Sequence, residues 1–324
     1  MNVTDLDGRY LFLFIEDVRE LVAAGKTAEP SRVVLKETGG ATIIDELHYA
    51  DFEGNIRLDL EDILTGHSSD MLPIADWSSN EEQCLDLTLE IDGYPYNFML
   101  NAMSKDALHM MSDIDFLYIP ERISIPVSFL SNEDQGCEVF LESSSGTTTL
   151  ASITFEEDLP CAQFCRTFDV SSLPVGKGTF RLACQIFGHN SGVRRSPMYK
   201  VTPGDYELYL FRNRFGAMEI FPMGGALEYA PAFKVETGKY GRSYRCTGVE
   251  SDDILRQSSG NLTRKAAQVL TAFLKSGRGY HWINGVWEPI AIEGINTAIK
   301  TTDSMHSLSF SFRYQNPIEI QNIM

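Results

Sequence analysis

The stretch YHWINGVWEP at residues 280–289 decides the fold class of this chain. Asn-Gly is the preferred dipeptide of two-residue type I′ hairpin turns, because both turn positions need a positive φ. A turn at Asn284 and Gly285 places Trp282 opposite Trp287 on the partner strand. The stretch therefore predicts an antiparallel β-ribbon.

This ribbon carries three aromatic side chains on one side, Tyr280, Trp282 and Trp287, while His281 faces Glu288. Aromatic rings on one face can stack on a sugar ring, which makes these three residues a candidate binding face. They can equally pin the ribbon to the preceding helix, whose apolar side needs cover. The sequence leaves both interpretations open.

A helix is predicted directly before the ribbon, over residues 261–276. Asn261 can cap its first turn, and Gly277 supplies the stop. The apolar residues recur at helical spacing and form one stripe: Leu262, Ala266, Val269, Leu270, Phe273 and Leu274. A second, shorter helix is predicted over residues 16–24 from the spacing of its apolar residues.

Strand signals dominate the rest of the chain. The last strand alternates Leu308, Phe310, Phe312 and Tyr314 with polar residues, which is typical of a half-buried strand. Other short alternating stretches are separated by Asp-Gly, Pro-Gly and Ser-rich turns, and this spacing favours sandwiches or barrels over parallel α/β units. The predicted fold class is therefore mainly β, with β-sandwich or barrel-type domains and one C-terminal helix packed on a sheet.

Two boundaries divide the chain into three predicted domains. The first follows Ile119 and separates an N-terminal β-rich domain, residues 1–119, from a β-sandwich-like domain, residues 120–203. The second lies at the Pro-Gly link over residues 201–205. It leaves a C-terminal β domain, residues 204–324, that carries the helix over 261–276.

The formal net charge of −18 is concentrated before the second boundary. Residues 1–203 hold 33 Asp and Glu against 14 Lys and Arg, whereas residues 204–324 hold 12 against 13. An acidic surface repels DNA phosphates, so no nucleic-acid partner is expected. The apolar run at residues 10–15 is too short to span a bilayer, so no membrane partner is expected either.

The usual catalytic and metal-binding signatures are missing from the sequence. Gly25-Lys26-Thr27 copies the end of a phosphate-binding P-loop, but Glu20 stands where the first glycine belongs. Cys161 and Cys165 are the one close cysteine pair, without a second ligand pair nearby. No enzyme activity, cofactor or metal is therefore expected, and the six thiols are expected to be free. A carboxylate-dependent glycosidase stays a lesser alternative, because sequence cannot show two facing carboxylates.

Two segments carry a resemblance to a known family. DFEGNIRLDLEDIL at residues 51–64 is similar to that family's acidic, Gly, Ile-x-Leu-Asp-Leu segment, and LYLFRNRFG at residues 208–216 is similar to its apolar strand and Asn-Arg-x-Gly turn. The helix, the ribbon and the aromatic final strand follow in the same order. In this layout, mostly over residues 45–65 and 204–317, the chain resembles tail or baseplate virion structural proteins of Bacteroidota phages and prophages, of the distal-tail type.

The resemblance implies a non-enzymatic structural component that assembles as a ring or sleeve with itself and with neighbouring phage tail proteins. Six copies to a ring is the number that it implies. It also implies a place in the virion, with assembly in the cytoplasm of the host bacterium. The alternative is a carbohydrate- or receptor-binding module of a phage or bacterial surface, which would hold a host surface glycan on Tyr280, Trp282 and Trp287. The resemblance implies no role for residues 66–200.

Overall fold

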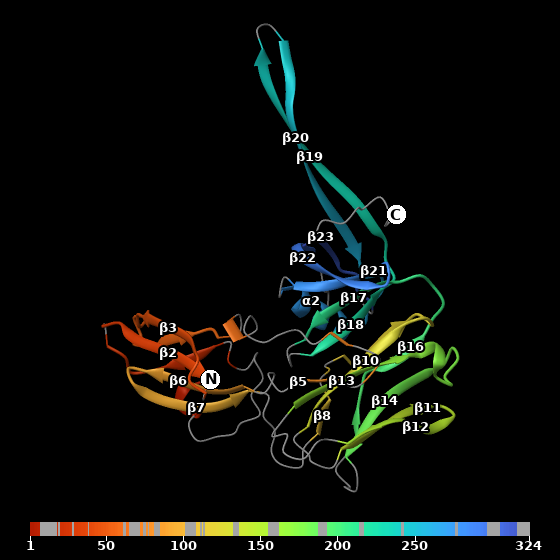
Figure 1. The fold of residues 1–324 in the computed structure, drawn as a ribbon, viewed down its shortest axis with the longest axis horizontal. Coiled ribbons are helices and arrows are strands. Elements are labelled where there is room, and N and C mark those ends of the chain that lie inside the picture. The colour runs from red at the N-terminus through yellow and green to blue at the C-terminus, as the bar shows by residue number, and fades with distance from the viewer. Residues whose placement is uncertain are drawn as a thin grey trace.

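The structure is a computed structural model, and it describes most of the chain. The residues that it describes are 1–6, 18, 20–27, 29–37, 39–60, 63–64, 72–73, 76, 78–80, 85–100, 108–110, 112, 114–131, 136–154, 162–186, 193–213, 217–240, 243–275, 278–296 and 305–315. The fold is mainly β, with several sheets and a helix in the C-terminal part (Figure 1). The predicted fold class is confirmed.

A four-stranded antiparallel sheet in the order β3-β2-β6-β7 forms most of the N-terminal unit. Its strands are β2 (Ser31–Glu37), β3 (Thr42–His48), β6 (Leu85–Ile91) and β7 (Tyr94–Leu100). Strand β6 buries every second residue and turns the others outward, as expected for a sheet with a core on one side. A short 3-10 helix, η1 (Val3–Asp5), adds Val3 to the same core.

Strand β1 (Leu21–Ala23) corrects the helix predicted over residues 16–24. It pairs antiparallel with β4 (Ile56–Leu58), so that Leu21 lies opposite Leu58. Both of these side chains are buried. The prediction was wrong because this pairing joins segments far apart in the sequence, and local spacing does not reveal it.

Two sheets, in the orders β5-β13-β10-β8 and β12-β11-β14-β16-β9, form the next unit, which we call the sandwich, and β15 flanks β14. The strands are β5 (Ser78–Asn80), β8 (Leu108–Met110), β9 (Phe116–Ile119), β10 (Ser124–Ser131), β11 (Cys137–Ser143), β12 (Gly146–Ile153), β13 (Ala162–Asp169), β14 (Thr179–Ile186), β15 (Arg194–Arg195) and β16 (Met198–Val201). Strand β9 pairs in parallel with β16. Strands from both sides of the predicted limit at 119/120 therefore share sheets, and the three-domain division stays a prediction.

A seven-stranded sheet in the order β18-β17-β21-β22-β23-β20-β19 forms the C-terminal unit. Its strands are β17 (Glu207–Arg212), β18 (Met218–Met223), β19 (Leu227–Tyr240), β20 (Ser243–Ser258), β21 (Arg278–Ile283), β22 (Val286–Asn296) and β23 (Ser309–Tyr314). The hairpin β21–β22 has the predicted register, with Trp282 opposite Trp287. Asn284 and Gly285 have φ values of 51° and 85°, so the type I′ turn is confirmed.

The helix α2 (Arg264–Lys275) begins three residues later than the sequence predicted. Leu262 forms an isolated antiparallel bridge with His306, which keeps the backbone extended before the helix. The cap is therefore Thr263 and not Asn261, because the Thr263 hydroxyl accepts a hydrogen bond of 3.2 Å from the Ala266 amide. The predicted stop at Gly277 lies outside the described residues.

The helix packs on one face of the C-terminal sheet, as predicted. The Phe273 ring lies 5.9 Å from the Phe211 ring and 6.4 Å from the Phe221 ring, measured between centroids. Tyr209 and Phe211 share this face, because alternate residues of a strand point the same way. The His281 ring stacks on Tyr209 at 4.6 Å, so His281 faces the helix side as well.

Strands β19 and β20 form a two-stranded arm that extends away from the rest of the chain (Figure 1). They pair with each other along their whole length, and β23 joins β20 at its base, from Leu255 to Ser258. The 14 residues of β19 reach roughly 45 Å at about 3.3 Å per residue. Over residues 243–254, strand β20 pairs with β19 and with no further strand of the described structure.

Buried hydrophobic side chains form two clusters in the described part of the chain. One lies within the N-terminal unit, between Val3 and Leu100. The other runs from Ile114 to Phe312 and combines residues of the sandwich with residues of the C-terminal sheet. The sandwich and the C-terminal sheet therefore share one core.

Candidate functional site

A groove of about 550 Å³ lies between the C-terminal sheet and the sandwich, and we call it the tryptophan groove. The C-terminal sheet lines it with Leu208, Leu210, Ile220, Trp282 and Trp287. The opposite wall consists of Pro73, Arg122, Ile123, Ser124, Pro126, Thr167, Asp169 and Ser171. It is a concave, mainly apolar site with a few polar groups, as binding sites in proteins commonly are.

The structure brings two of the three predicted binding residues into this groove. Trp282 and Trp287 line it, and their rings lie 5.0 Å apart at an angle of 60°. Trp282 is 40% exposed and offers an open ring, whereas Trp287 packs against the core. Tyr280 is partly buried against the same core and does not line the groove.

The helix is not what covers these tryptophans. Trp282 follows His281 in strand β21, so its side chain points to the opposite side of the sheet. His281 faces α2 through its stack with Tyr209, and Trp282 faces the sandwich with Leu210. The interpretation that these rings pin the ribbon to the helix was therefore wrong, because the helix lies on the other face.

Two polar side chains on the sandwich side of the groove, Asp169 and Ser171, bond to each other. The Asp169 carboxylate accepts hydrogen bonds of 3.0 Å from the Ser171 amide and 2.8 Å from the Ser171 hydroxyl. These bonds form the cap of a short 3-10 helix, η4 (Val170–Ser172). Arg122, by contrast, is exposed at the groove, so its guanidinium is the group that most directly offers charge to an incoming molecule.

A second polar cluster lies on the helix side of the sheet, around His281. His281 is 1% exposed, its Nδ1 lies 2.6 Å from Tyr314 Oη, and its Nε2 lies 2.8 Å from Glu207 Oε2. A carboxylate accepts, so in the neutral ring Nε2 donates to Glu207 and Nδ1 accepts from the Tyr314 hydroxyl. Glu288 lies opposite His281 in the register as predicted, but the ring bonds to Glu207 of β17 instead.

This cluster ties strands β17, β21 and β23 together through side-chain hydrogen bonds. Burial, with the charges of Glu207 and Glu288, holds the pKa of the Tyr314 hydroxyl above its usual range, so the phenol stays protonated. Both ring nitrogens of His281 are occupied, and its ring stacks between Tyr209 and Tyr314. His281 is 1% exposed, so in this structure an incoming molecule does not reach its ring.

Cys137, Cys165 and Cys184 are buried and form no disulfide. Burial raises the pKa of Cys165 to about 11 and that of Cys137 to about 12, which keeps both thiols protonated at neutral pH. The other cysteines lie outside the described residues: Cys84, Cys161 and the side chain of Cys246. Within the described ranges, no group of three or more His, Cys, Asp or Glu residues is arranged to hold a metal ion.

Sequence reasoning missed the floor of the groove and its opposite wall. Leu208 and Leu210 were identified as strand residues, but no local signal shows that β17 lies beside β21. Thr167 and Arg122 come from the sandwich, and only the packing of two units brings them near Trp282. A search for residues of non-adjacent strands that share one face could have found Leu210, since it pairs with Tyr280.

No family model matches this chain, and no curated protein matches it. Among solved structures it is similar to a mutant alpha-2-macroglobulin from Salmonella, at 8% identity and a TM-score of 0.22, over 87% of this chain and 21% of that chain. It is also similar to the Escherichia coli alpha-2-macroglobulin activated by trypsin, at 9% identity and a TM-score of 0.19, over 93% and 23%. The chain thus spans about a fifth of the length of these proteins. TM-scores this low carry no argument about fold or function. Among the described residues, no helix is long and apolar enough to cross a membrane.

Proposed function

We propose that this chain is a non-enzymatic structural subunit of a phage tail or baseplate, which assembles as a ring or sleeve with copies of itself and with neighbouring tail proteins. The proposal combines the sequence resemblance with one structural observation, the β19–β20 arm. The resemblance supplies the setting in a virion. The arm supplies a physical reason for assembly.

An isolated two-stranded ribbon is at best marginally stable in water. Here β19 and the outer part of β20, residues 243–254, pair with each other and have no further strand beside them in the described structure. Their outer edges therefore carry backbone N–H and C=O groups that no neighbouring strand of the described structure pairs with. Such edges are templates for pairing with another chain.

In the proposed assembly, the backbone groups at the edges of one arm form hydrogen bonds with those of the next copy, and the same contact repeats from copy to copy. If the β19 edge of one copy meets the β20 edge of the next, every subunit uses one edge of each kind. Such a contact is head-to-tail, and it closes into a ring when the rotation between copies closes. Backbone hydrogen bonds supply the affinity in this mode of recognition, so the contact does not depend on a particular set of side chains.

The test for a place in the virion is mass spectrometry of tailed particles purified from the bacterium that encodes the chain. We expect peptides of this chain in the particles, at a constant copy number relative to the major capsid protein. Intact tailed particles that lack the chain, while the lysate contains it, would contradict the proposal.

A carbohydrate- or receptor-binding module is the second candidate, and the tryptophan groove is the observation that favours it. The open ring of Trp282 can stack on a sugar, and Arg122 and Thr167 stand across from it. A glycan array probed with the parent chain and with Trp282→Ala tests this function. Binding to one glycan class that the variant loses would favour it, and a blank array would count against it.

A further inference from the structure

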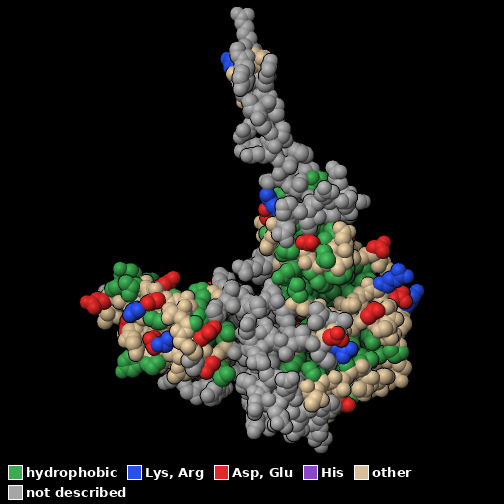
Figure 2. All heavy atoms as spheres, viewed as in Figure 1, with side chains coloured by type: hydrophobic (Ala, Val, Ile, Leu, Met, Phe, Trp, Pro, Cys, Tyr) green, Lys and Arg blue, Asp and Glu red, His purple; other side chains and the backbone are tan. Residues whose placement is uncertain are grey.

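Phe52 is the most exposed large hydrophobic residue of the described chain, at 98%. It lies at the tip of the turn over residues 51–55, between β3 and β4. Leu47 and Tyr49, just before this turn, are also exposed, at 64% and 73%. Hydrophobic side chains are visible on the surface of the N-terminal unit in Figure 2. Burial of one Phe side chain contributes about 1.5–3 kcal/mol of free energy. Phe52 does not obtain this stabilisation within its own chain and would obtain it in an interface.

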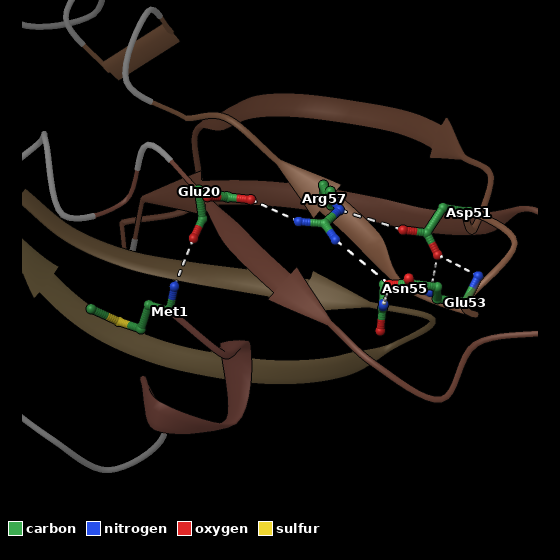
Figure 3. A network of polar contacts seen from close by, with 6 residues as sticks. All are labelled: Met1, Glu20, Asp51, Glu53, Asn55 and Arg57. Atoms are coloured by element: carbon green, nitrogen blue, oxygen red, sulfur yellow. Dashed lines mark hydrogen bonds and ion pairs between the residues drawn. The ribbon is translucent and has the colours of Figure 1, made fainter.

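A network of polar contacts fixes the turn that carries Phe52 (Figure 3). Asp51 Oδ1 accepts hydrogen bonds of 2.9 Å from the amides of both Glu53 and Asn55. The Asp51 amide donates to the Asn55 carbonyl at 2.8 Å, and the Gly54 amide donates to the Asp51 carbonyl at 3.0 Å. The two residues flanking Phe52 are thus held in place, so little loop entropy is lost when Phe52 is bound.

Arg57 anchors this turn to the body of the N-terminal unit. Its guanidinium lies 3.4 Å from the Asp51 carboxylate and 2.7 Å from the Glu20 carboxylate (Figure 3). The N-terminal ammonium of Met1 donates a further bond of 2.8 Å to the Glu20 carbonyl. An exposed aromatic ring on a turn braced in this way has the properties of a preorganised anchor for an interface.

We propose that Phe52 of one copy inserts into the tryptophan groove of the next copy. The inference rests on the proposed self-assembly and names a second contact that would act together with the arm. Phe52 does not fill the groove of its own chain, since it is 98% exposed. The anchor and the groove lie in different units, so the contact can repeat head-to-tail from copy to copy and close a ring.

The groove is suited to an aromatic side chain. Leu210, Ile220 and Ile123 are almost fully buried and form its apolar floor, with two tryptophans at one wall. An aromatic side chain buries roughly 150–250 Å² on entering such a site and gains further from edge or stacked contacts with other rings. A sugar would need several polar partners, and two of the polar side chains of the groove, Asp169 and Ser171, already bond to each other, which leaves Arg122, Ser124 and Thr167.

Charge complements the apolar contact. Glu53 follows Phe52 directly and is exposed, with Arg57 no closer than 3.9 Å in that ion pair. Arg122 is exposed at the mouth of the groove. Residues 1–119 hold 24 Asp and Glu against 7 Lys and Arg, whereas residues 120–324 hold 21 against 20. The acidic unit therefore meets a far less acidic surface, with Glu53 placed to pair with Arg122.

Photocrosslinking tests the contact on the full chain. p-Benzoylphenylalanine replaces Phe52 in one preparation and Tyr94, another aromatic residue of the same unit that is 74% exposed, in the control. Each is mixed with nitrogen-15 labelled parent chain at a concentration where sedimentation shows association, and is then irradiated. We expect crosslinks between labelled and unlabelled copies from position 52 to the peptides around Leu208 and Trp282, and none to these peptides from position 94.

Charge reversal provides the second measurement. Glu53→Arg and Arg122→Glu should each weaken association, and the double variant should restore part of the loss. Phe52→Ala should weaken association by at least about tenfold, whereas Tyr94→Ala should leave it unchanged. Matching melting curves of these exposed-site variants show that the fold is kept.

The outcomes separate this inference from the proposed assembly. Copies that associate while position 52 crosslinks elsewhere, or not at all, overturn the Phe52 contact and leave the assembly standing. A chain that stays monomeric at every concentration overturns both. A glycan that quenches tryptophan fluorescence in the parent chain but not in Trp282→Ala, without affecting association, would show that the groove binds a sugar. This result would also overturn the Phe52 contact.

Discussion

At the scale of single residues, Gly285 occupies a backbone position that few other residues accept. Its φ is 85°, and a Cβ there would meet no atom within 4 Å, so any cost of substitution is conformational. Gly285→Val should lower the free energy of unfolding by about 1–3 kcal/mol, because β-branched residues resist positive φ. Gly285→Asn is the matched control and should cost far less, since Asn tolerates this region. Equal thermal melting of the two variants would show that the turn is not of type I′.

Gly279 is required because the Phe211 ring packs closely against its Cα, which leaves no room for a side chain. A Cβ on Gly279 would lie 2.8 Å from the Phe211 ring, whereas a Cβ on Gly294, also in the C-terminal sheet, would meet nothing within 4 Å. Gly279→Ala should therefore cost about 1–3 kcal/mol of unfolding free energy by overpacking, and Gly294→Ala should be close to neutral. Urea unfolding of both variants checks this, and a neutral Gly279→Ala would mean that β21 does not pack on Phe211.

Cys165 should make stability depend on alkaline pH. Burial raises its pKa from 9.0 to about 11 in the folded chain, so the folded state holds the proton more tightly than the unfolded state does. The stabilisation is complete below about pH 9 and is lost as pH rises towards 11, by about 2–3 kcal/mol in all. Cys165→Ala should show a shallower fall in unfolding free energy between pH 8 and 10.5 than the parent, as measured in urea. Parallel curves would mean that this thiol is not buried.

At the scale of elements, mutations can distinguish Thr263 from Asn261 as the N-terminal cap of α2. Thr263→Ala should cost about 1 kcal/mol of unfolding free energy, because it removes the hydroxyl that accepts from the Ala266 amide. Asn261→Ala is the control and should change little, since Asn261 is exposed and precedes the helix by three residues. Urea unfolding of the two variants measures both losses. A larger loss for Asn261→Ala than for Thr263→Ala would identify Asn261 as the cap.

The sequence predicts those elements that depend on residues close together in the chain. It does not predict those that depend on pairing with a strand far away in the sequence. The Asn284-Gly285 turn, the ribbon register and the stripe of α2 follow from residues within one element. Strand β1 and the Glu207–His281 bond depend on partners far away in the sequence, and no local spacing encodes them.

The candidate site shows the same division. Both of its tryptophans are predicted by the sequence, because they share a ribbon face, while the sandwich wall and the exposure of Phe52 are visible only in the fold. The sequence places Phe52 within the segment 51–64 and does not reveal that its side chain is exposed.

At the scale of the whole molecule, the described chain combines a shared core with a projecting arm. The core from Ile114 to Phe312 joins the sandwich to the C-terminal sheet, and Ser112 adds a hydrogen bond to the Glu219 carboxylate of β18. Among the side chains that the structure describes, the arm adds to this core only residues of its base, Leu227 and Leu255. Contacts with other chains are the role that we propose for its edges.

The most direct test of the central claim, self-assembly through the arm, is sedimentation of two chains over a range of concentrations. In the second chain, residues 231–253 are replaced by Asn-Gly, which joins Ala230 to its register partner Ile254 in a two-residue turn. With equal melting temperatures for both chains, we predict that the parent associates towards a closed oligomer as its concentration rises, while the armless chain stays monomeric. Identical sedimentation of the two chains at every concentration would contradict the account.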